Sequence, residues 1–171
     1  DLLLRSYQQL QICRRPRAAS IKAAALPASP ETQPAMELGS LASNVRRQGP
    51  LRALVAEDES LTARFLVSVL EANGFQADHA ENGARAVDML SARTYDAVML
   101  DLNMPELDGY GVLSRLRQMP QYAGTPVLVL SARNQERDIL RAFSLGASDY
   151  VTKPFSPPEV VFRLKRMVEN N

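Results

Sequence analysis

A carboxylate ends one of the most apolar segments of the chain. The apolar residues 98–100 lead directly into Asp101, and Pro105 and Gly109 follow within the next eight positions. Apolar runs of this kind form buried parallel strands, and the proline and the glycine prevent the strand from continuing. We therefore expect Asp101 to be exposed at the carboxyl end of a strand, which is the edge where open α/β sheets bind their ligands.

A second group of carboxylates follows another apolar segment. Glu57, Asp58 and Glu59 come directly after residues 51–56. If Glu57 and Asp58 converge with Asp101, a cation has to offset their mutual repulsion. Ligands that offer only oxygen suit Mg²⁺, which takes one or two carboxylates directly and keeps several waters. Glu59 is interpreted as a solvated charge at the start of a helix.

Two further polar side chains follow predicted strands. Ser131, with the small Ala132 after it, offers a hydroxyl at the end of a fourth strand, and Lys153 follows a fifth strand. The lysine carries a compact positive charge that suits a phosphoryl oxygen. Together with Asp101 and a divalent metal, these side chains favour the transfer of a phosphoryl group onto an aspartate.

The spacing of apolar residues alternates along the chain between the period of a strand and that of a helix, and the elements it predicts position these residues. The predicted strands span residues 51–56, 75–80, 96–100, 126–131 and 149–152. The predicted helices begin at Ser60, Asn82, Tyr110, Asn134 and Ser156 and end near Asn73, Arg93, Met119, Leu145 and Val168. Strands that alternate with helices in this way predict a doubly wound α/β fold, in which five helices cover both faces of a five-stranded parallel sheet.

The first fifty residues differ in composition from the rest of the chain. Residues 1–50 are mildly basic and rich in alanine, proline and serine, whereas residues 51–171 carry a small excess of acidic side chains. Apolar spacing within residues 2–13 predicts the remnant of an amphipathic helix, and residues 18–50 hold too few large apolar side chains to fold alone. We therefore expect a helix remnant and flexible linker in residues 1–50 and one domain in residues 51–171.

Composition also restricts the class of protein. The chain has 171 residues, a net charge of +1 and a single cysteine, Cys13, which excludes an internal disulfide and argues against a zinc site. Neither charge balance indicates a dedicated nucleic-acid-binding protein, and no apolar run is long enough to span a bilayer. We expect a cytoplasmic protein with no membrane insertion in this segment and no direct nucleic-acid contact. The start on Asp1 rather than on a methionine suggests that the chain was cut from a longer one or processed.

Residues 51–168 resemble a response regulator receiver domain of two-component signalling. Four segments carry the resemblance, in the order and at the spacings of that family: Glu57-Asp58, residues 101–105 with Asp108-Gly109, Ser131-Ala132, and residues 149–155. Each segment alone is weakly specific, but four in order over this length are strongly specific. The resemblance implies a flavodoxin-like fold of five strands and five helices, which agrees with the periodicity.

The resemblance implies a metal site and a phosphorylation site. Asp101 is the implied phosphoacceptor. Asp58, Asp101 and the backbone carbonyl of Asn103 are the implied ligands of Mg²⁺, with Glu57 acting through water. Glu57 stands where the family more often has Asp, and its longer side chain should leave metal binding intact. Asn103 and Arg133 flank the mouth where hydrolytic water would approach, so they are expected to tune the lifetime of the phosphate.

The resemblance also implies a conformational switch. Ser131 would hold a phosphoryl oxygen, and Lys153 would pair with the phosphoaspartate and precede Pro154 through a cis peptide bond. Tyr150 matches the aromatic residue that turns inward when the hydroxyl residue moves toward the phosphoryl group. A receiver of this kind catalyses its own phosphorylation and dephosphorylation and then controls an output domain or a partner protein.

The implied phosphoryl donor is a sensor histidine kinase or a histidine phosphotransfer protein. Residues 146–160 are most similar to receivers of winged-helix transcription factors, which dimerise through helix four, strand five and helix five; this face would bind an output domain, a partner protein or a second copy. Ile139 and Ser148 replace charged residues of that dimer. The retained charges are Asp149, Glu159 and Arg163. Both a stand-alone regulator and the terminal receiver of a hybrid sensor histidine kinase fit this pattern.

Two other functions fit parts of the pattern. A degenerate receiver would be a docking module that needs no phosphorylation, but the acids, Ser131 and Lys153 are all present. A phosphatase of the haloacid-dehalogenase kind also phosphorylates an aspartate, yet it places a second Asp where this chain has Asn103. His79 lies on the weakly apolar second strand, away from the motifs, and is interpreted as structural or exposed rather than as a phosphodonor.

Overall fold

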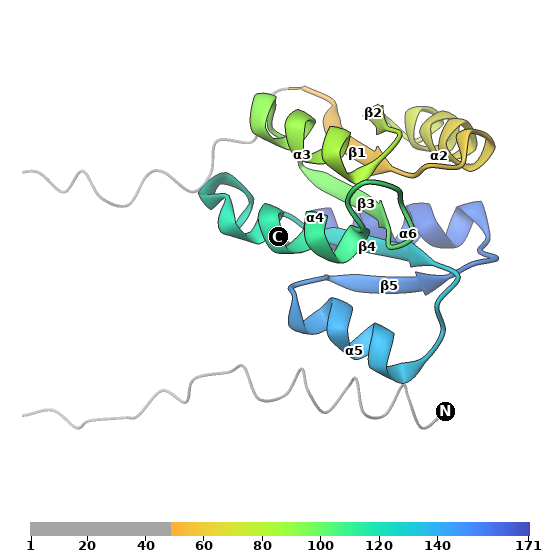
Figure 1. Cartoon of the computed structure of the whole chain (residues 1–171). Coiled ribbons are helices and arrows are strands. Elements are labelled where there is room, and N and C mark those ends of the chain that lie inside the picture. Colours follow the sequence, from red (N-terminus) through yellow and green to blue (C-terminus); the bar gives the residue numbers. More distant parts are fainter. Residues whose placement is uncertain (1–48) are drawn as a thin grey trace, which may run out of the picture. The chain divides into compact units, whose positions relative to one another are not determined.

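The computed structural model describes residues 49–171, so the predicted helix remnant, Cys13 and all but the end of the predicted linker lie outside the described residues. The described part is a five-stranded sheet with flanking helices (Figure 1). The strands are β1 (Leu51–Ala56), β2 (Phe75–Ala80), β3 (Ala97–Asp101), β4 (Val127–Ser131) and β5 (Asp149–Thr152). The helices are α2 (Ser60–Ala72), α3 (Gly83–Ala92), α4 (Gly109–Gln118), α5 (Glu136–Ser144) and α6 (Pro157–Glu169), with a 3₁₀ helix η1 (Pro120–Tyr122) before β4. Within residues 49–171, no helix is both long enough and apolar enough to cross a membrane.

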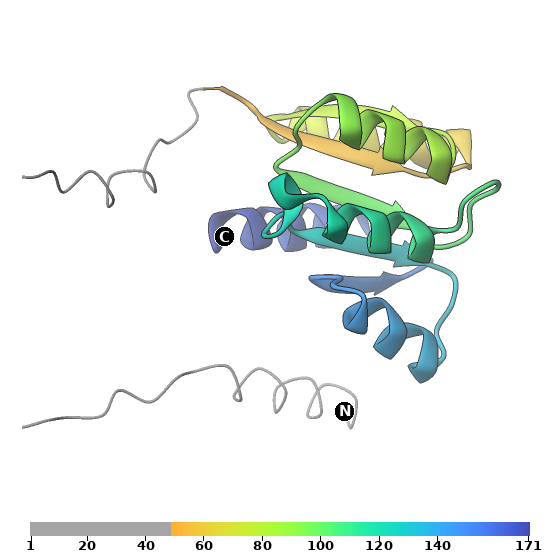
Figure 2. The same cartoon turned by 60° about the vertical axis from the view of Figure 1, so that its left-hand side comes forward.

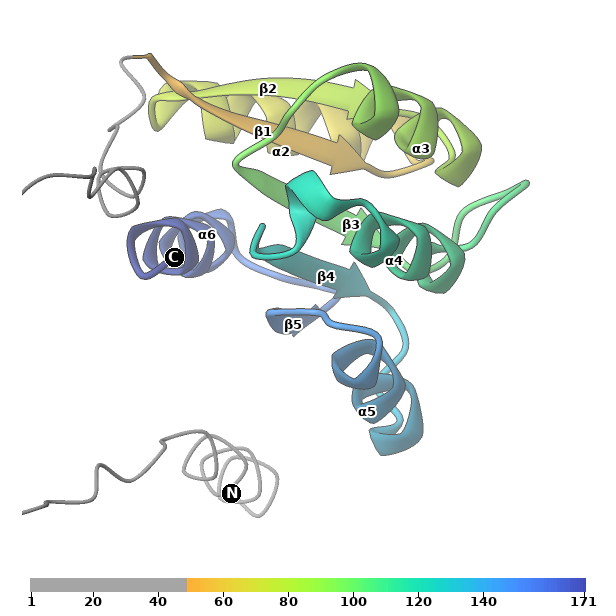
Figure 3. The ribbon, with the colours of Figure 1, turned by 90° about the vertical axis from the view of Figure 1, so that its left-hand side faces the viewer.

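All five strands are parallel, in the order β2-β1-β3-β4-β5. Helices α3, α4 and α5 cover one face of the sheet, and α2 and α6 cover the other (Figures 2 and 3). The sheet is therefore buried on both faces, as parallel sheets usually are. The predicted doubly wound α/β fold, with five strands and five helices, is confirmed.

Strand β3 shows why its sequence is apolar without interruption. Val98 and Leu100 pack with residues of α3 and α4, whereas Met99 packs with residues of α2 and α6. All three side chains are fully buried, because helices cover both sides of this central strand. The packing holds β3 rigidly and so determines where Asp101, its last residue, lies.

Several element boundaries differ from the predictions. Strand β3 ends one residue later than predicted, so that Asp101 belongs to the strand. Helix α2 begins at Ser60, but the cap position is Glu59, whose carboxylate accepts a hydrogen bond from the Thr62 hydroxyl at 2.7 Å. Helix α5 begins at Glu136, two residues later than predicted. Such boundaries depend on local hydrogen bonds at the helix ends, which hydrophobic periodicity does not report.

Candidate functional site

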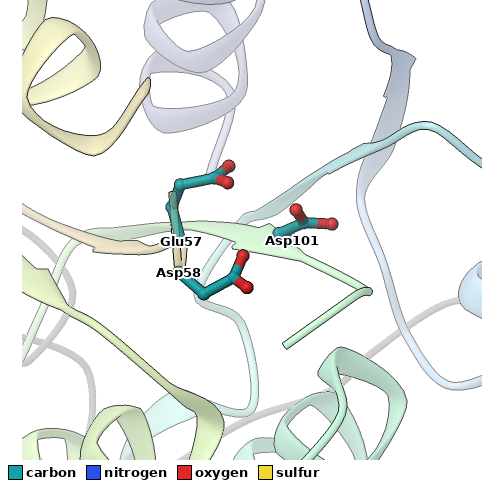
Figure 4. Close-up of side chains that lie close together, drawn as sticks. All are labelled: Glu57, Asp58 and Asp101. Carbon is teal, nitrogen blue, oxygen red and sulfur yellow. The ribbon is translucent and has the colours of Figure 1, made fainter. Parts of the chain in front are cut away.

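Three carboxylates meet at the carboxyl edge of the sheet. Glu57 and Asp58 follow β1, and Asp101 ends the neighbouring strand β3, where Ala56 pairs with Leu100. One carboxylate oxygen from each of the three acids lies within 4.8 Å of the other two (Figure 4). Parallel neighbouring strands bring their carboxyl ends to the same edge, and this explains why acids more than forty positions apart converge.

The prediction that Asp101 is exposed is wrong. Asp101 is only 4% exposed and Glu57 only 1%, whereas Asp58 is exposed. The chain after β3 folds back over the strand end, where the Asn103 backbone N–H donates to Asp101 Oδ1 at 2.9 Å. The ammonium group of Lys153 covers the other oxygen. Burial removes water from the carboxylate, so its surroundings act on its charge more strongly than they would at the surface.

Lys153 connects the two buried acids. Its Nζ donates to both carboxylate oxygens of Glu57, at 2.9 and 2.7 Å, and to Asp101 Oδ2 at 2.6 Å. The residue follows β5, and its backbone N–H donates to the Ser131 carbonyl at 2.9 Å, so the sheet aims the side chain at the acids across β4. The peptide bond between Lys153 and Pro154 is cis, as the family resemblance implied.

The charges at this edge are not balanced. Burial raises the pKa of the Glu57 carboxyl above its ordinary value, the hydrogen bond from Lys153 lowers it, and repulsion from Asp101 raises it further. Burial opposes the positive charge of Lys153, but its hydrogen bonds to Asp101 and Glu57 outweigh burial and raise its pKa. One ammonium group faces three carboxylates, so the cluster favours an additional cation. Its oxygen-only donors make it compatible with Mg²⁺.

The remaining predicted site residues surround Arg133. Ser131 is fully buried at the end of β4, and its Oγ accepts a hydrogen bond from the Arg133 backbone N–H at 3.2 Å. Tyr150 is half-buried, and its hydroxyl donates to the Arg133 carbonyl at 2.7 Å. Asn103 is exposed, and its side-chain oxygen accepts from Arg133 Nε at 2.8 Å. Ser131, Tyr150 and Asn103 therefore share one neighbour beside the acid cluster.

Sequence reasoning misplaced His79 relative to the motifs. Its Nε2 lies 2.7 Å from the backbone carbonyl oxygen of Glu57, next to the acid cluster, although the side chain is exposed as expected. The register of the sheet causes this, because Val55 pairs with His79 and Glu57 follows two residues later. Knowledge of the β1–β2 register was the one signal that could have revealed the contact.

The charged residues retained on the predicted dimer face are paired within the chain. Arg163 Nη1 lies 2.8 Å from Asp149 Oδ2, and Arg163 Nη2 lies 2.9 Å from Glu159 Oε1. The hydrogen bond to Asp149 raises the pKa of Arg163, burial lowers it, and the attraction to Asp149 and the contact with Glu159 raise it further, so the pKa lies above its ordinary value. These charges stabilise the contact between β5 and α6 in a single copy.

Fold and site together define a class of small doubly wound α/β domains with an acidic cluster and a lysine at the carboxyl edge of the sheet. Residues 53–165, more than half of the chain, match the family model described as the response regulator receiver domain. The chain therefore belongs to the response regulator receiver domains of two-component systems.

Individual relatives agree with the family. Transcriptional regulatory protein SrrA of Staphylococcus aureus is 38% identical over 115 residues, which cover 67% of this chain and 46% of SrrA. The chain thus spans about half the length of the curated relatives it matches. The receiver domain of a Francisella response regulator is 34% identical, with a TM-score of 0.66 over 71% of this chain and 98% of that domain. The receiver domain of a signal transduction histidine kinase from Syntrophus aciditrophicus is also 34% identical, with a TM-score of 0.65 over 70% of this chain and 90% of that domain.

Proposed function

We propose that this receiver accepts a phosphoryl group on Asp101 from a histidine kinase or a histidine phosphotransfer protein. The observation that carries the proposal is the position of Lys153, whose ammonium group lies 2.6 Å from Asp101 Oδ2 and also binds Glu57. The positive charge of the same ammonium group can stabilise the negative charge that a phosphoryl group brings to Asp101. The family supports the general function, and the geometry supports the choice of residue.

The proposed reaction is a phosphoryl transfer between two nucleophiles. One carboxylate oxygen of Asp101 attacks the phosphorus atom, an O–P bond forms, and the P–N bond to the donor imidazole breaks. The electron pair of the broken bond leaves on the imidazole nitrogen. Lys153 stabilises negative charge on the phosphoryl oxygens, and burial of Asp101 keeps competing water away from the carboxylate.

The donor set fits Mg²⁺. Asp58, Asp101 and the backbone carbonyl of Asn103 would hold the ion, and Glu57 would act through water. Asp58 is exposed and so can bind an incoming ion without losing a buried partner, whereas both oxygens of Glu57 already bind Lys153. When bound, the ion supplies positive charge that offsets the repulsion between the acids and the phosphoryl oxygens.

Ser131 and Tyr150 are proposed to report the phosphoryl group to the surface formed by α5, β5 and α6. Both residues bind Arg133 and lie at β4 and β5, next to that surface. Because Arg163 is already paired with Asp149 and Glu159, we propose that this surface binds an output domain or a partner protein rather than a second copy through those charges. Receiver chemistry of this kind fits both a regulator and a hybrid kinase.

The test is Mg²⁺-dependent labelling with acetyl phosphate, followed by intact mass and by mobility in phosphate-affinity gels. The parent should gain one phosphoryl group, Asp101→Asn should gain none, and a chelator should prevent labelling. Glu106→Gln is the matched control, because Glu106 is an exposed carboxylate in the same loop. Labelling of Asp101→Asn to the level of the parent would contradict the choice of residue, and an unlabelled parent would favour a docking module.

A further inference from the structure

Arg133 extends from the acid site toward α5. On the site side, its Nε donates to the side-chain oxygen of Asn103 at 2.8 Å, and the Asn103 backbone N–H in turn donates to Asp101 Oδ1 at 2.9 Å. On the helix side, its Nη1 lies 3.7 Å from Asp138 Oδ1, in the first turn of α5. One guanidinium group therefore touches the loop that holds Asp101 and the helix next to the proposed output surface.

Asp138 connects the same helix turn to the core. The hydroxyl of Tyr110, which is 3% exposed, lies 3.3 Å from both the backbone carbonyl and the carboxylate oxygen Oδ1 of Asp138. The guanidinium group of Arg141 stacks over the Tyr110 ring at 4.1 Å from its centre. The first turn of α5 is thus held against Tyr110 of α4 by the hydrogen bonds to Asp138, and Arg141 in the last turn of α5 adds a cation–π contact.

The ion pair between Arg133 and Asp138 can be displaced. The Arg133 side chain is 45% exposed and the two charged atoms are 3.7 Å apart, a geometry in which ion pairs contribute little. A phosphoryl group on Asp101 would carry nearly two negative charges and three strong acceptor oxygens. It would arrive beside Asn103, whose side-chain oxygen already accepts a hydrogen bond from the Arg133 guanidinium group. A doubly charged acceptor then competes with a singly charged one for the same guanidinium group.

We propose that Arg133 is a clasp that exchanges partners when Asp101 is phosphorylated. Without the phosphoryl group, Arg133 pairs with Asp138 and helps to hold the start of α5 against Tyr110. With it, the guanidinium group turns to the phosphoryl oxygens, Asp138 loses its cation, and the first turn of α5 loosens. The clasp rests on the proposed function, because it needs a phosphoryl group on Asp101.

Hydrogen–deuterium exchange of α5 tests the clasp, with Mg²⁺ and beryllofluoride as the probe for the phosphoryl group. In the parent, the probe should speed exchange in residues 136–141 by about two- to fivefold, the range expected for the loss of one exposed ion pair. Arg133→Gln and Asp138→Asn should show the faster exchange without the probe, and the probe should change it little. Arg137→Gln is the matched control, because it removes an exposed charge from the same helix and should behave as the parent does.

Fluorine NMR on the same samples separates the two proposals. A parent that binds no beryllofluoride contradicts the proposed function itself. A parent that binds it while exchange in α5 stays unchanged or slows contradicts the clasp, as does an Arg133→Gln variant that matches the parent in both states. If Arg133→Gln does not bind the probe, Asp138→Asn decides by the same criteria, since it leaves every group at the acid site in place.

Discussion

The two ends of the parallel strands differ in how their polar groups are paired; we call them the amino edge and the carboxyl edge of the sheet. At the amino edge, Arg117 at the end of α4 and Tyr122 in η1 lie beside the starts of β4 and β5. Arg117 donates four hydrogen bonds, all to backbone carbonyls: two to Gly146 at 3.1 and 2.7 Å, one to Tyr122 at 2.7 Å and one to Thr125 at 2.9 Å. Tyr122 is fully buried, and its hydroxyl bonds the carbonyls of Leu90 and Arg93.

The carboxyl edge keeps an excess of one charge instead. Glu57 and Asp101 are buried there with Asp58 beside them, and Lys153 is the cation that binds the first two. Satisfied hydrogen bonds at the amino edge stabilise the fold, whereas unbalanced carboxylates at the carboxyl edge cost stability until a cation arrives. The hydrogen bonds at the amino edge thus offset the stability that the unbalanced carboxylates cost at the carboxyl edge, where the cation and the phosphoryl group are proposed to bind.

Arg117→Met should give the largest effect and should act on folding alone. It leaves the carbonyls of Gly146 and Thr125 without their donor, so the free energy of unfolding should fall by about 3 kcal/mol. Urea denaturation measures the loss, and labelling by acetyl phosphate under native conditions should persist. Arg115→Met, an exposed position in the same helix, should change stability little. Equal losses of stability in Arg117→Met and Arg115→Met would show that the hydrogen bonds of Arg117 at the amino edge do not stabilise the fold specifically.

Lys153→Met should act on both folding and signalling. Without Mg²⁺, the buried carboxylates lose their cation, and stability should fall by about 2 kcal/mol, most of which saturating Mg²⁺ should restore. Asp101 is still present, so some phosphoryl label should be incorporated. Amide NMR with beryllofluoride should nevertheless lack the parent's shifts around Ser131 and Tyr150. Lys165→Met is the surface control, and a parent-like NMR pattern in Lys153→Met would rule out the role given to Lys153.

Glu57→Gln should raise the free energy of unfolding, whereas Arg117→Met and Lys153→Met should lower it. Burial raises the pKa of Glu57 above 4.5, so its contribution to stability is present below that pH and is lost as the pH rises through the folded-state pKa. In Mg²⁺-free buffer at neutral pH the variant should therefore be more stable than the parent, and the difference should disappear in acid. Mg²⁺ affinity should fall. Thermal unfolding across pH measures this, with the exposed Glu59→Gln as control; a less stable Glu57→Gln would show that the carboxyl edge is balanced.

Removing residues 1–49 should have the smallest effect, since the core of the sheet begins in β1. The free energy of unfolding should change by less than about 0.5 kcal/mol, and Mg²⁺ affinity should stay the same. Thermal unfolding and Mg²⁺ titration compare the two chains. Removal of residues 1–56, which also deletes β1, should abolish cooperative unfolding. If removal of residues 1–49 by itself already abolished cooperative unfolding, the amino-terminal segment would belong to the core.

Hydrophobic periodicity, together with the glycine and proline residues that end strands and helices, predicted most of the fold. The central strands were recognised because parallel strands buried on both faces need nearly unbroken apolar residues, as in residues 98–100. The edge that carries the site also followed from the sequence, since carboxyl ends of parallel strands lie together. Helix starts were less predictable, because Glu59 and Thr62 meet through a side-chain hydrogen bond that periodicity does not encode.

The sequence by itself determined the strand and helix order and the acids, hydroxyl and lysine that meet at the carboxyl edge, because these depend on local periodicity and on strand ends. The tertiary structure alone decided that Asp101 is buried, that Lys153 binds both Glu57 and Asp101, and that Arg133 lies between Asn103 and Asp138. Such contacts depend on strand register and on the paths of long side chains. Both are set by packing between segments far apart in the chain, and no local pattern records them.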